Sequence, residues 1–180
     1  MVTIFFESHA TTEDNEAQRA AGWYDVALSE AGELQAKQLG KRYADQVFDA
    51  IFCSDLQRSY KTAQQAFGDV YPIVQDPRLR ECNYGDMNRG TKAEIEAGKR
   101  QALTTPFPHG ESYQDTSRRM KAFLQDLLKN YDGKTIMIIG HRATQYGLDQ
   151  WVQGMSLEAA VLAPWRWQPG WKYELALYEK

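Results

Sequence analysis

Two short apolar runs, far apart in the chain, each lead into a histidine, and this pattern constrains the fold more than any other feature. Residues 2–6 are Val-Thr-Ile-Phe-Phe and are followed closely by His9, and residues 135–140 are Thr-Ile-Met-Ile-Ile-Gly and are followed by His141. Such β-branched and aromatic runs, bounded by glycine and polar residues, predict interior strands of an α/β sheet. Ligands of open α/β sheets bind outside the carboxyl ends of the strands. We therefore expect the two imidazoles to meet in one pocket.

Helical and extended patterns alternate along the rest of the chain. Ser29 is expected to cap a helix that runs to about Tyr43, Ser54 and Asp55 to open the next helix, and Ser112 to cap the clearest helix of all. Further strands are predicted at 49–53, 72–74 and 172–178, and a further helix after 141. This order predicts a three-layer α/β sandwich, with a mostly parallel central sheet and helices on both faces. Residues 1–180 are expected to form a single domain, in which residues 78–110 are an insertion over the active-site edge.

Composition excludes several classes of function. The net charge of −3 over 180 residues argues against a broad nucleic-acid surface, so that any anion site has to be a local pocket. The apolar runs are too short to cross a membrane, and the N-terminus lacks the pattern of a signal peptide. Two cysteines, Cys53 and Cys82, suggest neither a disulfide framework nor a metal site. These features predict a cytoplasmic protein with no nucleic-acid or membrane partner.

Polar residues follow the predicted strands in a series of segments that is similar to a known protein family. In chain order the segments are His9-Ala-Thr-Thr-Glu-Asp-Asn15, Ser54-Asp-Leu-Gln-Arg58, Leu79-Arg-Glu81, Gly110-Glu111-Ser112 and Gly140-His141. Over nearly the whole chain this series resembles the histidine phosphatase superfamily, in its phosphoglycerate mutase-like branch. The resemblance implies the phosphoglycerate mutase-like fold and a metal-independent reaction on a small phosphorylated substrate.

The resemblance also implies a role for each of four residues. His9 would attack phosphorus and become a phosphohistidine, which divides one difficult step into two. Arg58 and His141 would donate to the phosphoryl oxygens as negative charge develops on them. Glu81 would protonate the leaving oxygen and later take a proton from the attacking water. No metal ion and no cofactor is expected, because three scattered histidines without clustered carboxylates make a poor metal site.

One departure from the family pattern concerns phosphate binding. The family signature Arg-His-Gly is replaced by Ser8-His9-Ala10, so that a bidentate phosphate contact is lost. Arg142, directly after the second histidine, is a candidate to supply the missing positive charge from the opposite side of the pocket. An alternative is that Arg142 starts a helix and points to solvent. Further residues expected at the substrate are Ser8, Thr12, Asn15, Glu111 and Ser112.

Some of these residues also have ordinary structural explanations. Thr12 and Asn15 can bind phosphate oxygens or simply fix the loop, and Glu111-Ser112 can form the start of a helix instead of contacting substrate. The three tryptophans of the segment Trp165–Trp171 can cover the site or line a substrate pocket. Packing of this segment onto the core is the interpretation that we favour.

These observations predict a phosphomonoesterase that acts through phospho-His9. One alternative is a phosphomutase of the same family, although mutases of this branch typically have longer insertions that keep water from the intermediate. Another alternative is a catalytically weak protein that binds or senses a phosphorylated ligand, because Ser8 replaces the arginine. Retention of a nucleophile, His9, together with an acid, Glu81, favours hydrolysis.

Overall fold

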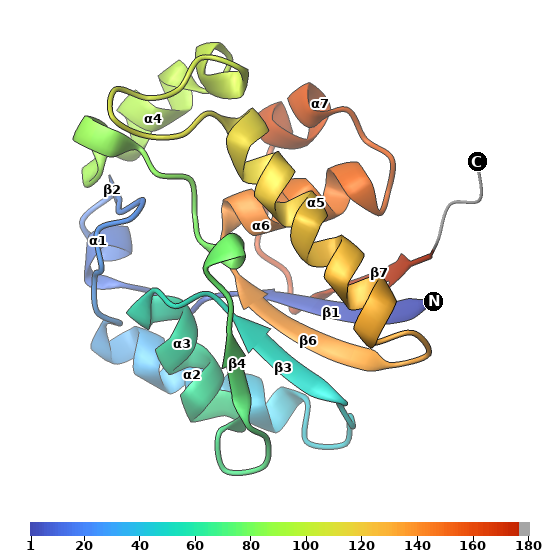
Figure 1. Ribbon diagram of the computed structural model, residues 1–180. Helices are drawn as coiled ribbons and strands as arrows, with labels where there is room; N and C mark the ends of the chain where they lie inside the picture. Colours follow the sequence, from blue (N-terminus) through green and yellow to red (C-terminus); the bar gives the residue numbers. More distant parts are fainter. Residues whose placement is uncertain (177–180) are drawn as a thin grey trace.

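A five-stranded sheet forms the centre of the molecule in the computed structural model, which describes residues 1–176 (Figure 1). The strand order is β4 (Ile73–Gln75), β3 (Ala50–Cys53), β6 (Thr135–Gly140), β1 (Val2–Ser8) and β7 (Trp171–Leu175). The first four strands are parallel, and β7 is antiparallel to β1. The sheet is therefore mixed and mostly parallel, as predicted, with β1 and β6 side by side so that His9 and His141 leave the same edge.

Alternation along the strands sends apolar side chains to both faces of the sheet. Ile136 and Ile138 of β6 pack in a core cluster with α5 (Tyr113–Asn130) and α6 (Arg142–Trp151). Met137 and Ile139 pack in a second cluster with α2 (Glu30–Arg42) and α3 (Gln57–Phe67). All four β6 side chains are fully buried, and each stabilises the fold by about 1.5–3 kcal/mol relative to an exposed position. The three-layer sandwich is confirmed.

Helix starts follow the predicted caps, with one exception. Ser29 accepts from the backbone N–H of Gly32, and Ser112 from that of Asp115, at the first turns of α2 and α5. The prediction that Ser54 and Asp55 open α3 is off by two residues, because this helix begins at Gln57. The Ser54 hydroxyl is occupied elsewhere, 2.6 Å from the side chain of His141.

Short elements beside the sheet form a third apolar cluster. The segment between β4 and α5 contains the short helices η1 (Pro77–Leu79), η2 (Gly85–Met87), α4 (Lys92–Gly98) and η3 (Gln101–Leu103), and the strand β5 (Gly90–Thr91). β5 pairs with β2 (Arg19–Ala20), which follows α1 (Glu13–Glu16), so that two loops are tied together next to the sheet edge. Tyr84, Ile95 and Phe107 pack against α6 and α7 (Leu157–Leu162).

The last strand determines where the tryptophan-rich segment lies. β7 runs antiparallel to β1, with Trp171 paired to Phe6, so the chain has to enter β7 at the carboxyl edge of the parallel strands. Tyr173 and Leu175 are buried in the alternating pattern expected of this strand, while the predicted inward position Leu177 lies outside the described residues. Within residues 1–176, no helix combines the length and the apolar character that a membrane crossing requires.

Candidate active site

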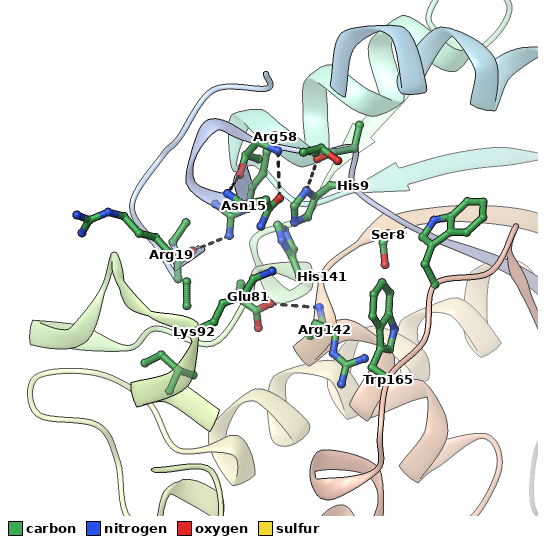
Figure 2. A pocket seen from close by; sticks show the side chains of 18 of the residues that line it. Ser8, His9, Asn15, Arg19, Arg58, Glu81, Lys92, His141, Arg142 and Trp165 are labelled. Carbon is green, nitrogen blue, oxygen red and sulfur yellow. Dashed lines mark hydrogen bonds between the residues drawn. The ribbon is translucent and has the colours of Figure 1, made fainter. Parts of the chain in front are cut away.

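A cavity of about 1130 Å³ opens at the carboxyl ends of β1, β3 and β6. His9, Arg58, Glu81 and His141 all line it, from four different segments of the chain (Figure 2). The rings of His9 and His141 lie 5.1 Å apart between centroids. The two imidazoles therefore meet in one pocket, as the strand pattern predicted.

His9 has one ring nitrogen engaged and the other available. Its Nδ1 lies 2.7 Å from the carbonyl oxygen of Ala10. Because a carbonyl can only accept, Nδ1 has to bear the hydrogen, which leaves the lone pair on Nε2. Burial, together with the charge of Arg58, lowers the pKa of His9 from its ordinary 6.5 to about 3. The imidazole is therefore neutral at physiological pH, in the form that can act as a nucleophile.

His141 is more deeply enclosed than His9. It is only 1% exposed, and its Nε2 lies 2.6 Å from the hydroxyl of Ser54. Its backbone N–H donates to the side chain of Thr144 at the start of α6. Burial, and the nearby positive charge of Arg58, lower the pKa of His141 well below its ordinary value. This second imidazole is thus held rigidly and in its neutral form.

Arg58 is a buried cation held by carbonyl groups. It is 2% exposed, and its guanidinium donates to the carbonyl oxygens of Gly22 and Tyr24, at 2.7 and 3.2 Å. These bonds orient the guanidinium, yet within residues 1–176 no carboxylate forms an ion pair with it. A buried charge without a counter-ion is costly, and an anion bound in the cavity would relieve that cost.

Glu81 lies against the first turn of α6. One carboxylate oxygen accepts from the backbone N–H groups of Cys82 and Ala143, and the other accepts from that of Arg142. The side chain is 7% exposed and is also a cavity residue. The start of α6 therefore fixes this carboxyl group beside His141 and defines one side of the cavity.

The loop that follows β1 brings Ser8, Thr12 and Asn15 to the cavity. Thr12 caps α1: its hydroxyl accepts from the backbone N–H of Asn15, and the Asn15 side chain in turn accepts from the N–H of Thr12, each at 3.0 Å. Thr12 is fully buried and fixes the loop, and its contact with phosphate remains a prediction. Contacts of Ser8 and Asn15 with phosphate remain predictions.

Arg142 lines the same cavity but is directed toward aromatic rings. Its guanidinium carbon lies 5.0 Å from the ring centroids of both Tyr146 and Trp165, and Nη2 donates to the Tyr146 hydroxyl. Figure 2 shows this side chain extending away from His9 toward Trp165. Arg142 does start α6, as the alternative supposed, but its side chain is directed toward these rings and not to solvent. Its compensation for the arginine missing at Ser8 stays a prediction.

Glu111 and Ser112 are not among the residues that the structure brings to the cavity. Glu111 accepts from the guanidinium of Arg119 and from the backbone N–H of Asn83. Ser112 caps α5 and is 2% exposed. Their positions agree with the alternative in which both residues form the start of a helix. Glu111 lies against α5 because the Arg119 guanidinium binds its carboxylate.

The tryptophan segment departs from the favoured interpretation of core packing. Trp171 does pack against Phe6 in the core, with ring centroids 5.8 Å apart, and Trp165 stacks on it at 6.3 Å. Trp165 and Trp167, however, are 40% and 61% exposed and line the cavity. This correction follows from the antiparallel β7, which requires the preceding loop to cross the carboxyl edge of the sheet.

Other cavity residues were not anticipated from the sequence. The spacing of Tyr146, four residues after Arg142 in a predicted helix, was a usable signal, because such residues share a helix face. The basic side chains come from β2, α2 and α4, and their direction toward the cavity depends on how these elements pack together, which no local pattern specifies. The additional lining residues with polar or aromatic character include Arg19, Arg42, Tyr84, Lys92, Glu96, Lys99 and Tyr146. In the part of the chain that the structure describes, no group of three or more metal-ligating side chains forms.

Comparison with known proteins identifies related sequences. The family model of the histidine phosphatase superfamily (branch 1) matches residues 4–166. A probable phosphoglycerate mutase of Cronobacter sakazakii is 35% identical over 150 residues, which cover 78% of this chain and 70% of the relative. Phosphoserine phosphatase 1 of Hydrogenobacter thermophilus is 30% identical over 151 residues, covering 78% of this chain and 71% of its own.

Solved structures share the fold. The YhfR protein of Bacillus stearothermophilus superimposes with a TM-score of 0.83 and 26% identity, covering 99% of this chain and 96% of the other. A mycobacterial glucosyl-3-phosphoglycerate phosphatase, solved in complex with VO3, gives a TM-score of 0.75 and 26% identity, covering 88% and 85% of the two chains. The architecture described above is therefore shared with YhfR and with a protein that is named as a phosphatase.

Proposed function

The chain belongs to branch 1 of the histidine phosphatase superfamily, and from that membership we propose that it is a metal-independent phosphomonoesterase acting through a phosphohistidine at His9. The relatives are named both as phosphatases and as phosphoglycerate mutases. The observation that carries the proposal is a neutral imidazole with a free Nε2 beside Arg58, a buried cation that has no ion-pair partner among residues 1–176. The substrate would be a small phosphorylated metabolite.

The reaction would proceed in two displacements at phosphorus. In the first, the Nε2 lone pair of His9 forms a bond to phosphorus while the bond from phosphorus to the leaving oxygen breaks. Glu81, in its carboxylic acid form, gives its proton to that oxygen, and the alcohol leaves. In the second, Glu81 takes a proton from water as the water oxygen attacks phosphorus. The bond from phosphorus to Nε2 breaks as the new oxygen–phosphorus bond forms, inorganic phosphate is released, and neutral His9 is regenerated.

Charge on the transferred group would be balanced mainly by Arg58. Developing negative charge on the phosphoryl oxygens is stabilised best by donors that are already in place, and the carbonyls of Gly22 and Tyr24 keep this guanidinium in place. His141, with its ring 5.1 Å from that of His9, would donate to another of the phosphoryl oxygens. Ser8 can offer only one hydroxyl where the family pattern has a guanidinium.

The decisive experiment compares wild type with His9→Ala in metal-free buffer, with 4-nitrophenyl phosphate as the first substrate. We expect turnover and a phosphate adduct, detected by mass spectrometry of the acid-sensitive phosphoenzyme, and both should disappear in His9→Ala. His109→Ala is the matched control, because this third histidine is exposed and contacts Asp86. Its rate should equal that of wild type.

The other outcomes distinguish the alternatives. A phosphoenzyme that returns its group to an added alcohol faster than to water would identify a phosphomutase, the activity named for several relatives. Absence of turnover and of adduct, with inorganic phosphate still bound, would contradict the enzyme assignment. It would favour a ligand-binding protein in which the replacement of the family arginine by Ser8 has abolished catalysis.

A further inference from the structure

Arg119 of α5 binds the main chain of the segment that carries Glu81. Its Nη1 donates to the carbonyl oxygens of Arg78 and Arg80, at 2.7 and 2.8 Å, and its Nη2 donates to that of Glu81 at 2.9 Å. The other two donors, on Nε and Nη2, bind the two carboxylate oxygens of Glu111 at 2.9 and 3.0 Å. All five guanidinium donors are therefore used, and three of them hold the main chain at and before the expected proton donor.

Glu111 ties Arg119 to the chain that follows Glu81. Its Oε2 accepts from the backbone N–H of Asn83 at 2.9 Å, and its own backbone N–H donates to the Asn83 carbonyl oxygen at 2.8 Å. The side chains of Arg119 and Glu111 are 18% and 19% exposed, so that salt screens this bidentate pair less than a pair on the surface. The segment is therefore held both before and after Glu81.

A second donor reaches the Glu81 carbonyl oxygen from the loop before α2. Trp23 Nε1 donates to this oxygen at 2.8 Å. The guanidinium carbon of Arg80 lies 4.5 Å from the centroid of the Trp23 ring, and Arg80 is itself fixed by two hydrogen bonds of 2.6 Å to Asp55. Both lone pairs of the Glu81 carbonyl oxygen are therefore engaged, so that this peptide group cannot turn without breaking two hydrogen bonds.

The position of the Glu81 main chain determines where its carboxyl group can lie. The carboxylate accepts from three backbone N–H groups at 2.8–3.2 Å, and these bonds keep it at the cavity only while the main chain of Glu81 stays in place. Within residues 1–176, neither Arg119 nor Trp23 is among the residues that line the cavity. Both are therefore placed to act on the reaction through Glu81 and not by contact with a substrate.

From these contacts we propose that Arg119, supported by Glu111 and Trp23, is a positioning residue that holds Glu81 where it can protonate the leaving oxygen. The inference rests on the proposed function, in which Glu81 is the acid of the first displacement. Proton transfer requires the carboxyl group to lie within roughly 2.6–3.2 Å of the oxygen that it protonates. A displacement of about 1 Å can lower a rate about 10²-fold. Glu111 thereby acquires a role that needs no contact with substrate.

Leaving groups of different acidity distinguish a misplaced acid from a general loss of structure. 4-Nitrophenyl phosphate and phenyl phosphate differ only in the nitro group, and 4-nitrophenolate leaves without protonation more readily than phenolate. Hydrolysis of the phosphoenzyme does not affect kcat/KM, which covers the steps up to departure of the phenol. We expect Arg119→Gln to lower kcat/KM at least about tenfold for phenyl phosphate and less than about threefold for 4-nitrophenyl phosphate.

Three further variants assign this effect to Glu81. Trp23→Phe keeps an aromatic ring and removes the Nε1 donor, so that it should show the same selective loss at a smaller size, about threefold. Glu81→Gln should show the selective loss in full, and Arg119→Gln added to it should lower kcat/KM for phenyl phosphate by less than about twofold more, because an absent acid cannot be misplaced. Arg118→Gln is the matched control on α5: its side chain is 69% exposed and pairs with Asp115, and its kcat/KM values should equal those of wild type.

Equal losses on the two esters in Arg119→Gln would overturn the proposal, and so would a further tenfold loss in the double variant with Glu81→Gln. If thermal unfolding shows that Arg119→Gln is not folded at the assay temperature, Trp23→Phe decides, and an unchanged ratio of the two kcat/KM values refutes the role. If wild type turns over neither ester, the proposed function fails separately. Hydrogen exchange then tests the positioning, which is refuted if the amides of Cys82 and Asn83 exchange no faster in Arg119→Gln and Trp23→Phe than in wild type.

Discussion

At the His9 end of the cavity the polar groups are fixed by backbone, whereas at the Trp165 end they are held by one another and by aromatic rings. Arg58 is fixed by two carbonyl oxygens and Glu81 by backbone N–H groups. Arg142 instead rests on Tyr146 and Trp165, and Trp167 is 61% exposed. The first end is suited to precise charge placement, and the second to contact with the variable part of a substrate.

The two ends also differ in how the chain builds them. At the His9 end, His9 and His141 directly follow strands β1 and β6, and Arg58 lies in the first turn of α3. Glu81 comes from the loop between η1 and η2, and backbone N–H groups of the first turn of α6 fix its carboxylate. The residues of the other end come from α4, α6 and the loop before β7. Strands and helices thus position most of the residues at the His9 end, while the Trp165 end is formed partly by a loop, and loops tolerate sequence change better.

Replacement of Arg58 is expected to give the largest effect on activity. An unchanged kcat would contradict the assignment of charge stabilisation to the His9 end of the cavity. Arg58→Gln should lower kcat by about 10²–10³-fold, because it removes preorganised charge at the phosphoryl group. Arg58→Lys, which keeps the charge but loses the fork of donors, should fall between wild type and Arg58→Gln. Steady-state kinetics with 4-nitrophenyl phosphate measure both.

A control is needed because Arg58 also holds the loop at Gly22 and Tyr24. Thermal unfolding should show that both variants are folded at the assay temperature, and Arg118→Gln, a change at an exposed arginine of α5, should behave as wild type. Unchanged kcat in a folded Arg58→Gln protein would mean that the phosphoryl group binds at another place in the cavity.

The low pKa of His9 predicts an effect of intermediate size on the pH dependence of the free energy of unfolding. The pKa is lowered from 6.5 to about 3 in the folded state, so between these values the unfolded chain binds a proton that the native protein does not. The free energy of unfolding should therefore decrease as the pH falls below about 6.5, by up to ~1.4 kcal/mol per pH unit from this group. His9→Gln should remove that contribution and flatten the dependence.

Urea unfolding of wild type and His9→Gln at several pH values between about 7 and about 5 measures this difference. The comparison cancels the contributions of His141 and of the carboxylates, which both proteins share. Parallel curves for the two proteins would show that His9 is exposed to water and titrates normally, which would weaken its assignment as the buried, neutral end of the cavity.

Ser112→Ala should give the smallest effect on activity. It tests whether Ser112 lies outside the substrate-binding site. Loss of the cap on α5 should destabilise the protein by about 1 kcal/mol. Activity should stay within about twofold of wild type, because the structure does not bring Ser112 to the cavity. An increase of several-fold in KM without loss of stability would restore Ser112 as a substrate contact.

Sequence patterns were sufficient for the layers of the fold and for the edge at which the site lies. The runs before His9 and His141 have the composition of interior strands, and the caps at Ser29 and Ser112 depend on a hydrogen bond only three residues away. Such signals are local, so that a single sequence contains them. The juxtaposition of the two histidines followed from the rule that parallel strands present the same edge.

Sequence patterns were not sufficient for side chains that could bond to more than one partner. Ser54 bonds to His141 instead of opening α3, and Glu111 pairs with Arg119 instead of facing the cavity. Arg142 turns toward Tyr146 and Trp165, a position that depends on the direction of β7. These choices are decided by packing between segments distant in sequence. The chain by itself therefore determined which edge carries the chemistry, and only the tertiary structure decided which side chains line the rest of the cavity.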